Sequence, residues 1–139
     1  FRAAMQKRRC LIPADVFFEW QDVPGQKRRK PYAVALNGGE IFALGGVWEA
    51  WRPKGGGEWV ITCAILTTEP NELLAPIHDR MPVIIRPDDY AKWISPSAGM
   101  AEVRQLVASF PSEEMKTWEI SLMVNDPKTD DARVIAPID

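Results

Sequence analysis

Residues 41–68, IFALGGVWEAWRPKGGGEWVITCAILTT, contain two apolar runs on either side of RPKGGG. A proline followed by consecutive glycines is typical of a turn, and runs rich in Val, Ile and Trp are typical of β-strands. The stretch therefore predicts a β-hairpin. Because its apolar residues are nearly continuous rather than alternating with polar ones, we expect both strands to be buried on both faces.

The rest of the chain predicts more short strands and few helices. Further strands are expected at 10–20, 31–36, 80–85 and 118–124, and the first two form a second hairpin around DVPGQKRRK. Helices are expected at 88–94 and 98–110, from acidic residues after a proline and from apolar residues at helical spacing. The order does not alternate as βαβ. We predict one α+β domain over residues 1–139, a strongly curved, barrel-like, mainly antiparallel sheet with a few flanking helices.

Composition excludes several classes of protein. The 139 residues are 46% hydrophobic and 26% charged, which fits a single soluble domain. There is no apolar run of membrane-spanning length and no secretory signal, so we expect a cytoplasmic protein with no membrane partner. Cys10 and Cys63 lie in apolar runs without CxxC spacing, which favours reduced core thiols over a zinc site. Signatures of nucleotide-phosphate loops and zincins are absent.

Positive charge gathers near the N-terminus. Residues 1–30 contain eight Lys or Arg against three acidic residues, although the whole chain has a net charge of −2. Such a surface could contact phosphates, with Arg8, Arg9 and residues 27–30 facing the nucleic acid. The alternative for residues 27–30 is a solvated hairpin loop.

His78 is the only histidine, and Asp79 and Arg80 follow it directly before an apolar strand. A histidine in this setting is suited to exchange a proton near a bound anion. Glu19 stands between Phe18 and Trp20, so in a strand it points away from both. It is either exposed at a sheet edge or buried and poised for proton transfer. The residues alone indicate a possible Glu19–His78 acid–base pair and leave a structural histidine open.

Three stretches together resemble the successive motifs of a known family. RRCLIPADVFFEW (8–20), TTEPNELLAPIHDRMPVII (67–85) and MVNDP with VIAPI (123–138) resemble, in order and spacing, those of the SOS response-associated peptidase (SRAP) family. The resemblance implies a monomeric, nucleoid-associated protein without a cofactor or metal that binds single-stranded DNA and captures abasic sites. In such proteins an N-terminal cysteine attacks the sugar aldehyde, and its amine and thiol together close a thiazolidine crosslink.

The resemblance also implies roles for particular residues. Glu19 matches a glutamate that manages protons at the attacking amine, and His78 matches a histidine that assists sugar ring opening and crosslink reversal. Thr67 and Arg80 match positions that contact DNA phosphates, and Trp20 matches an aromatic residue of the DNA-binding face. As alternatives, Arg80 could pair with the neighbouring aspartate and Trp20 could belong to the core.

The family nucleophile has no counterpart in this chain, which starts at Phe1, downstream of the segment that carries it. Neither Cys10 nor Cys63 can replace it, because a thiazolidine needs the amine and the thiol of one terminal residue. We therefore expect the full-length protein to be an abasic-site crosslinking enzyme with peptidase-like autoprocessing. This chain alone is expected to be inactive in crosslinking. The alternative is a noncovalent module for single-stranded or gapped DNA. Proteolysis of other proteins is a weaker alternative, since no catalytic triad is evident.

Overall fold

The computed structural model describes residues 1–138, which divide into two compact units. Each unit is assembled from three separate stretches of the chain. Unit 1 consists of Phe1–Ala14, Phe42–Thr68 and Pro82–Ser109. Unit 2 consists of Asp15–Ile41, Glu69–Met81 and the residues from Phe110 onward.

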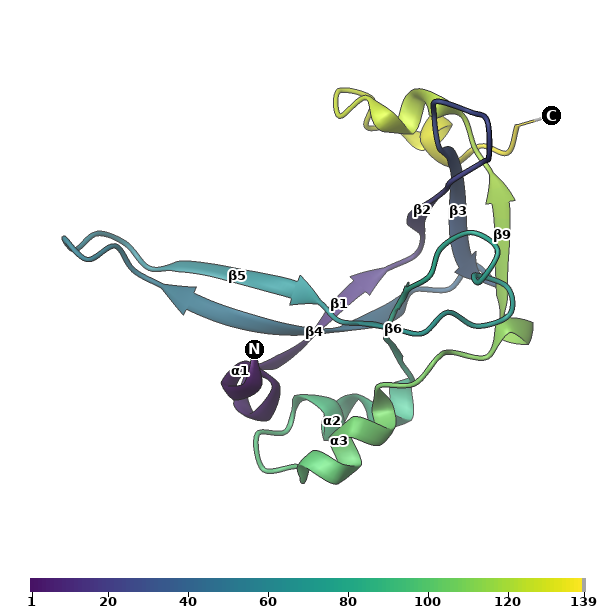
Figure 1. Ribbon diagram of the computed structural model, residues 1–139. Coiled ribbons are helices and arrows are strands. Elements are labelled where there is room, and N and C mark those ends of the chain that lie inside the picture. Colours follow the sequence, from purple (N-terminus) through teal and green to yellow (C-terminus); the bar gives the residue numbers. More distant parts are fainter. Residues whose placement is uncertain (139) are drawn as a thin grey trace. The chain divides into compact units, whose positions relative to one another are not determined.

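Unit 1 is built on an antiparallel sheet centred on β4 (Phe42–Trp51). Its other strands, all antiparallel to β4, are β1 (Arg9–Ala14), β5 (Val60–Ile65) and β8 (Ile84–Ile85). Strands β4 and β5 form the predicted hairpin, with Trp48 opposite Cys63. Its distal end projects beyond the helices of the unit (Figure 1).

Three helices accompany this sheet: α1 (Arg2–Lys7), α2 (Tyr90–Ile94), which follows the 3₁₀ turn η1 (Pro87–Asp89), and α3 (Met100–Leu106). Trp93 of α2 is fully buried with Val83, Ile85 and Val103, and its indole N–H donates to the Cys10 carbonyl at 2.8 Å. Glycine at position 45 allows this close packing, because a Cβ there would lie 3.1 Å from the Trp93 ring. The predicted helix at 98–110 is shorter than expected, and α1 was not predicted.

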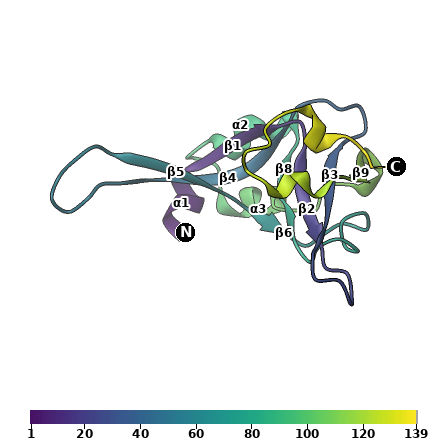
Figure 2. The same cartoon turned by 90° about the horizontal axis from the view of Figure 1, so that it is seen from above.

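Unit 2 contains a second antiparallel sheet in the order β2 (Phe17–Gln21), β3 (Lys30–Leu36), β9 (Met115–Glu119). The three strands lie side by side in Figure 1 and Figure 2. Ala33, Val34 and Ala35 of the central strand are buried. The 3₁₀ turns η2 (Ser112–Glu114), η3 (Leu122–Asn125) and η4 (Ala132–Ile135) flank β9. Strand β6 (Thr67–Thr68) ends a stretch of unit 1, and β7 (Met81–Pro82) crosses the boundary between units.

The antiparallel sheets and few helices agree with the predicted α+β class, but no sheet among residues 1–138 closes into a barrel, so that part of the prediction is not confirmed. The prediction that residues 10–20 form one strand is wrong. The stretch forms two strands, β1 and β2, which pair in different sheets after a break at residues 15–16. The strand expected at 118–124 instead ends at Glu119, and Ser121 Oγ accepts the Met123 N–H to begin η3.

Burial in the β4–β5 hairpin also differs from expectation. Residues 42–47 of β4 are buried as predicted, but every residue of β5 except Ala64 is exposed. Both cysteines are free, with Cys10 half-buried and Cys63 exposed, so they are not the predicted core thiols. An apolar composition shows that a strand is suited to burial, but it does not show what buries it. None of the helices within residues 1–138 could cross a membrane.

Candidate active site

The candidate site lies in unit 2, where β2 meets the turn that carries His78. Glu19 is the middle residue of β2 and pairs with Tyr32 of β3. The turn is held by Asn71, whose side chain accepts the Leu74 N–H at 3.0 Å and donates to the Phe110 carbonyl at 2.7 Å. The His78 N–H then donates to the carbonyl of Leu74, which is fully buried. These bonds fix the backbone from which the imidazole projects.

Glu19 and His78 face each other across a short gap. Glu19 Oε2 lies 3.9 Å from His78 Nδ1, and the two side chains are 18% and 36% exposed. The other oxygen, Oε1, accepts the backbone N–H of Trp20 at 3.0 Å. The exposed carboxylate of Asp79 lies 3.3 Å from the same nitrogen. The pair is therefore partly shielded from water and still open to a substrate.

The surroundings of His78 suit Nδ1 either as a hydrogen-bond donor or as an acceptor. Nδ1 lies 3.1 Å from the Arg80 backbone nitrogen and 3.0 Å from the Arg80 carbonyl oxygen. Without a proton, Nδ1 accepts the Arg80 N–H; with one, it donates to the carbonyl and faces two carboxylates. These four contacts are all made through Nδ1, and the side chain is 36% exposed, so a bound molecule can approach the ring. This arrangement can move a proton to or from a substrate.

Gln21 is a residue of the site that the sequence reasoning missed. Its amide donates to the Pro76 carbonyl at 2.8 Å and accepts the Tyr32 hydroxyl at 3.3 Å. It therefore ties β2 to the turn that precedes His78. The available signal was its spacing of two residues from Glu19, which puts both side chains on one side of the strand.

Trp20, whose side chain points to the opposite face of β2 from Glu19, borders an open hollow of about 690 Å³. Its indole N–H donates to Asn125 Oδ1 at 2.8 Å, and the ring is half-exposed. Arg28 and Arg29 also line the hollow, and Arg29 pairs with the exposed Asp22 at 2.8 Å. An aromatic ring beside two guanidinium groups is suited to a stacked planar group and a phosphate.

The other predicted residues divide between the units. Arg80, next to His78, belongs to unit 2, whereas Thr67, Arg8 and Arg9 belong to unit 1. Arg8 remains partly exposed and pairs with Glu49 at 2.8 Å. The structure thus brings Glu19, Trp20, His78 and Arg80 into one unit.

Arg9 is not on the surface where the charge pattern predicted it. It is 5% exposed, and its guanidinium donates only to backbone carbonyls, those of Met5, Gln6, Trp93 and Ser95. Burial lowers the pKa of this guanidinium from its usual value. Because its N–H groups point at the carbonyl ends of α1 and α2, this placement contradicts the predicted contact of Arg9 with DNA.

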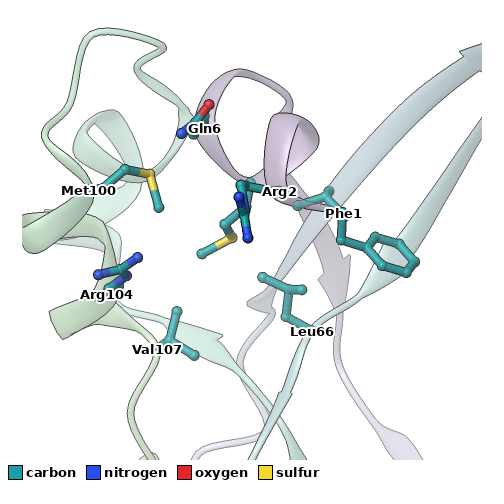
Figure 3. A pocket seen from close by; sticks show the side chains of 9 residues that line it. Phe1, Arg2, Gln6, Leu66, Met100, Arg104 and Val107 are labelled. Carbon is teal, nitrogen blue, oxygen red and sulfur yellow. The ribbon is translucent and has the colours of Figure 1, made fainter.

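A second cavity, of about 560 Å³, lies in unit 1 and contains none of the predicted residues. Met5, Leu66, Met100 and Val107 give it a largely apolar lining. Figure 3 shows Arg2 and Arg104 among the side chains around it, from α1 and α3. Among residues 1–138 there is no cluster of His, Cys, Asp and Glu that could hold a metal ion.

Comparison with known proteins gives consistent matches. The model of the family described as SOS response associated peptidase (SRAP) matches residues 1–127. Abasic site processing protein YoaM of Bacillus subtilis is 36% identical over 136 residues, covering 97% of this chain and 59% of that protein. Abasic site processing protein YoqW of the same organism is 35% identical over 136 residues, covering 97% and 60%.

Among solved structures, a crystal structure from Bacteroides thetaiotaomicron superposes with a TM-score of 0.91 at 29% identity. The match covers 99% of this chain and 60% of that one. The chain therefore spans about three-fifths of the length of these relatives.

Proposed function

This chain belongs to the SRAP family, and from that membership we propose that it forms the proton-transfer and DNA-binding part of an abasic-site processing protein. The observation that carries the proposal is the approach of Glu19 Oε2 to His78 Nδ1 at 3.9 Å. Two side chains that can exchange protons come from distant parts of the sequence and lie together at a partly shielded surface, which suits general acid–base catalysis.

The proposed reaction joins an N-terminal cysteine to the open-chain aldehyde of an abasic sugar. The amine adds to the aldehyde carbon, water leaves to give an imine, and the thiol then adds to the same carbon to close a thiazolidine. His78 protonates the sugar ring oxygen through Nε2 as the ring opens, and Glu19 accepts the proton that the attacking amine loses. The nucleophile comes from outside these 139 residues, because neither Cys10 nor Cys63 carries a free α-amine.

Single-stranded DNA is the proposed partner. Trp20 stacks on a base or sugar, while Arg28 and Arg29 meet phosphates along the hollow beside it. Arg80, next to His78 in unit 2, contacts a phosphate near the lesion, and Thr67, in unit 1, is a separate phosphate contact. Support for this arrangement comes from the half-exposed indole and the two arginines that line the same hollow.

The test is a denaturing gel that follows a labelled abasic oligonucleotide over time, using this chain alone and a fusion that carries a family-type N-terminal segment beginning with cysteine. We expect a covalent adduct only with the fusion. In the fusion, His78→Ala and Glu19→Gln should each slow crosslinking or its reversal by about 10²–10⁴-fold.

Asp79→Asn is the matched control, since this carboxylate is also near Nδ1 but is 89% exposed. It should change the rates by less than about tenfold. Crosslinking by the chain alone would exclude the N-terminal cysteine mechanism. Unchanged forward and reverse rates in both variants would make His78 a structural residue.

The second candidate function is noncovalent binding of single-stranded or gapped DNA. The hollow beside Trp20 favours it, because that surface needs no nucleophile. Fluorescence anisotropy at several salt concentrations tests it, with the logarithm of affinity falling by about 0.7 per tenfold salt for each phosphate contacted. Equal affinity for intact and abasic DNA, without an adduct in the fusion, would favour this candidate over the first.

A further inference from the structure

Strand β5 is apolar and yet largely exposed, with five of its six residues exposed to solvent. Within the β4–β5 hairpin, Trp51 and Trp59 are each 61% exposed, and Ile61 is 69% exposed. No charged residue stands between Trp59 and Leu66. Exposed sheet edges of soluble proteins usually carry charged residues, prolines or bulges that prevent pairing. This strand has none of them.

The outer edge of β5 also has unpaired backbone groups. Leu66, just after β5, donates its N–H to the carbonyl of Gly45 in β4, so the alternate residues Thr62 and Ala64 of β5 direct their hydrogen bonds toward β4. The residues between them, Cys63 and Ile65, direct theirs away from β4. Among residues 1–138 no strand pairs with that edge, because β5 is the last strand in the order β1–β4–β5.

We propose that the outer edge of β5 receives an extended, apolar strand from the portion of an SRAP protein that this chain does not contain. The first support is size, since about two-fifths of each bacterial relative lies outside its match to this chain. The second is the pattern of exposure on the strand. Strand addition supplies the missing hydrogen bonds, and the chain leading to it covers the apolar side chains.

A second copy of this chain fits the edge less well. Pairing β5 with another β5 would satisfy the edge but would leave both faces exposed on both copies, with Ile61 and Ile65 on one face and Val60 on the other. The exposed apolar area would then extend over two strands. A longer segment of the same protein can pair with the edge and also cover a face.

The experiment is amide hydrogen exchange, followed by NMR, on this chain and on the fusion with the family-type N-terminal segment. In the chain alone, the Thr62 and Ala64 amides should exchange slowly, whereas the Ile61, Cys63 and Ile65 amides should exchange fast. In the fusion, exchange at the latter three should slow by at least about tenfold. This readout is independent of crosslinking, so the proposal and the proposed function can fail separately.

Two variants of the fusion show whether the backbone edge is responsible. Cys63→Pro removes the outward N–H and should abolish the added protection at Ile61 and Ile65, whereas Cys63→Ala keeps the N–H and should retain it. Unchanged fast exchange in the unsubstituted fusion would overturn the proposal. Protection of the same amides in the chain alone that rises with its concentration would make a second copy the partner and also overturn it.

Discussion

Replacing Arg9 with methionine should destabilise the fold strongly without changing the DNA surface. Arg9 is 5% exposed and donates to four backbone carbonyls, among them those of Met5 at 2.6 Å and Trp93 at 2.5 Å. Methionine fills much of the same space but donates nothing. The carbonyls at the ends of α1 and α2 would then face an apolar side chain.

The expected loss follows from those hydrogen bonds. A bond to a charged donor contributes about 1.5–3 kcal/mol, and a buried carbonyl left without a donor costs about 1–3 kcal/mol. Some of the four carbonyls lie near solvent and can take water as a partner. We therefore expect a loss of about 3–5 kcal/mol, similar to breaking a buried charge interaction. For a chain of this size that lowers Tm by about 6–20 °C.

Urea and thermal denaturation measure this loss, and Arg8→Met is the matched control. Arg8 is the neighbouring residue, and its ion pair with Glu49 is partly exposed, so its removal should cost at most about 1 kcal/mol. At a temperature where both variants are folded, Arg9→Met should bind single-stranded DNA with the salt dependence of the unsubstituted chain. An Arg9→Met protein of normal Tm and weakened, less salt-dependent binding would refute a structural role for Arg9.

Three further substitutions or reactions test separate parts of the structure. Trp20→Ala should weaken binding of single-stranded DNA by about 1–3 kcal/mol in anisotropy titrations while Tm changes little; a loss of stability of about 3–5 kcal/mol would instead make it a core residue. Gly46→Ala should cost about 1–3 kcal/mol in urea unfolding, because its Cβ would lie 2.8 Å from a carbonyl oxygen of β5. Gly55→Ala, with open space around it, should be nearly neutral, and equal effects would exclude the steric explanation. Burial and the nearby Cys63 raise the pKa of the Cys10 thiol, so iodoacetamide should modify the exposed Cys63 first in peptide mass spectrometry, and equal rates would contradict this order.

The hairpins could be predicted because their signals are local. A turn sequence between two apolar runs predicts that the runs pair, and both β2–β3 and β4–β5 do so. The pairing of β1 with β4 and of β9 with β3 depends on distant parts of the chain, for which a single sequence has no comparable signal. The continuous apolar pattern over residues 10–20 therefore suggested one strand where the chain passes from one sheet to another.

For the candidate site, the sequence could likewise predict the types of residue involved but not their positions in space. A glutamate at position 19 and a histidine at position 78 indicate acid–base chemistry. Their proximity in space was a hypothesis, because it depends on the turn that the Asn71 side chain holds in place. Arg9 shows the limit of charge patterns. Arg9 is buried because the ends of two helices supply carbonyl acceptors, Met5 shortly before it in the sequence and Ser95 far after it. Helix α1 itself had no clear signal in the sequence.

The interleaving of the two units has a consequence for synthesis on the ribosome. The chain crosses from one unit to the other repeatedly, so neither unit can be completed while the other is still unmade. When β2 and β3 have emerged, the sheet that carries Glu19 is a two-stranded hairpin, which is marginally stable in water. It gains its third strand only with Met115–Glu119, near the end of translation. A nascent chain that stalls before β9 therefore exposes an incomplete sheet in unit 2, and such chains are substrates for chaperones and proteases.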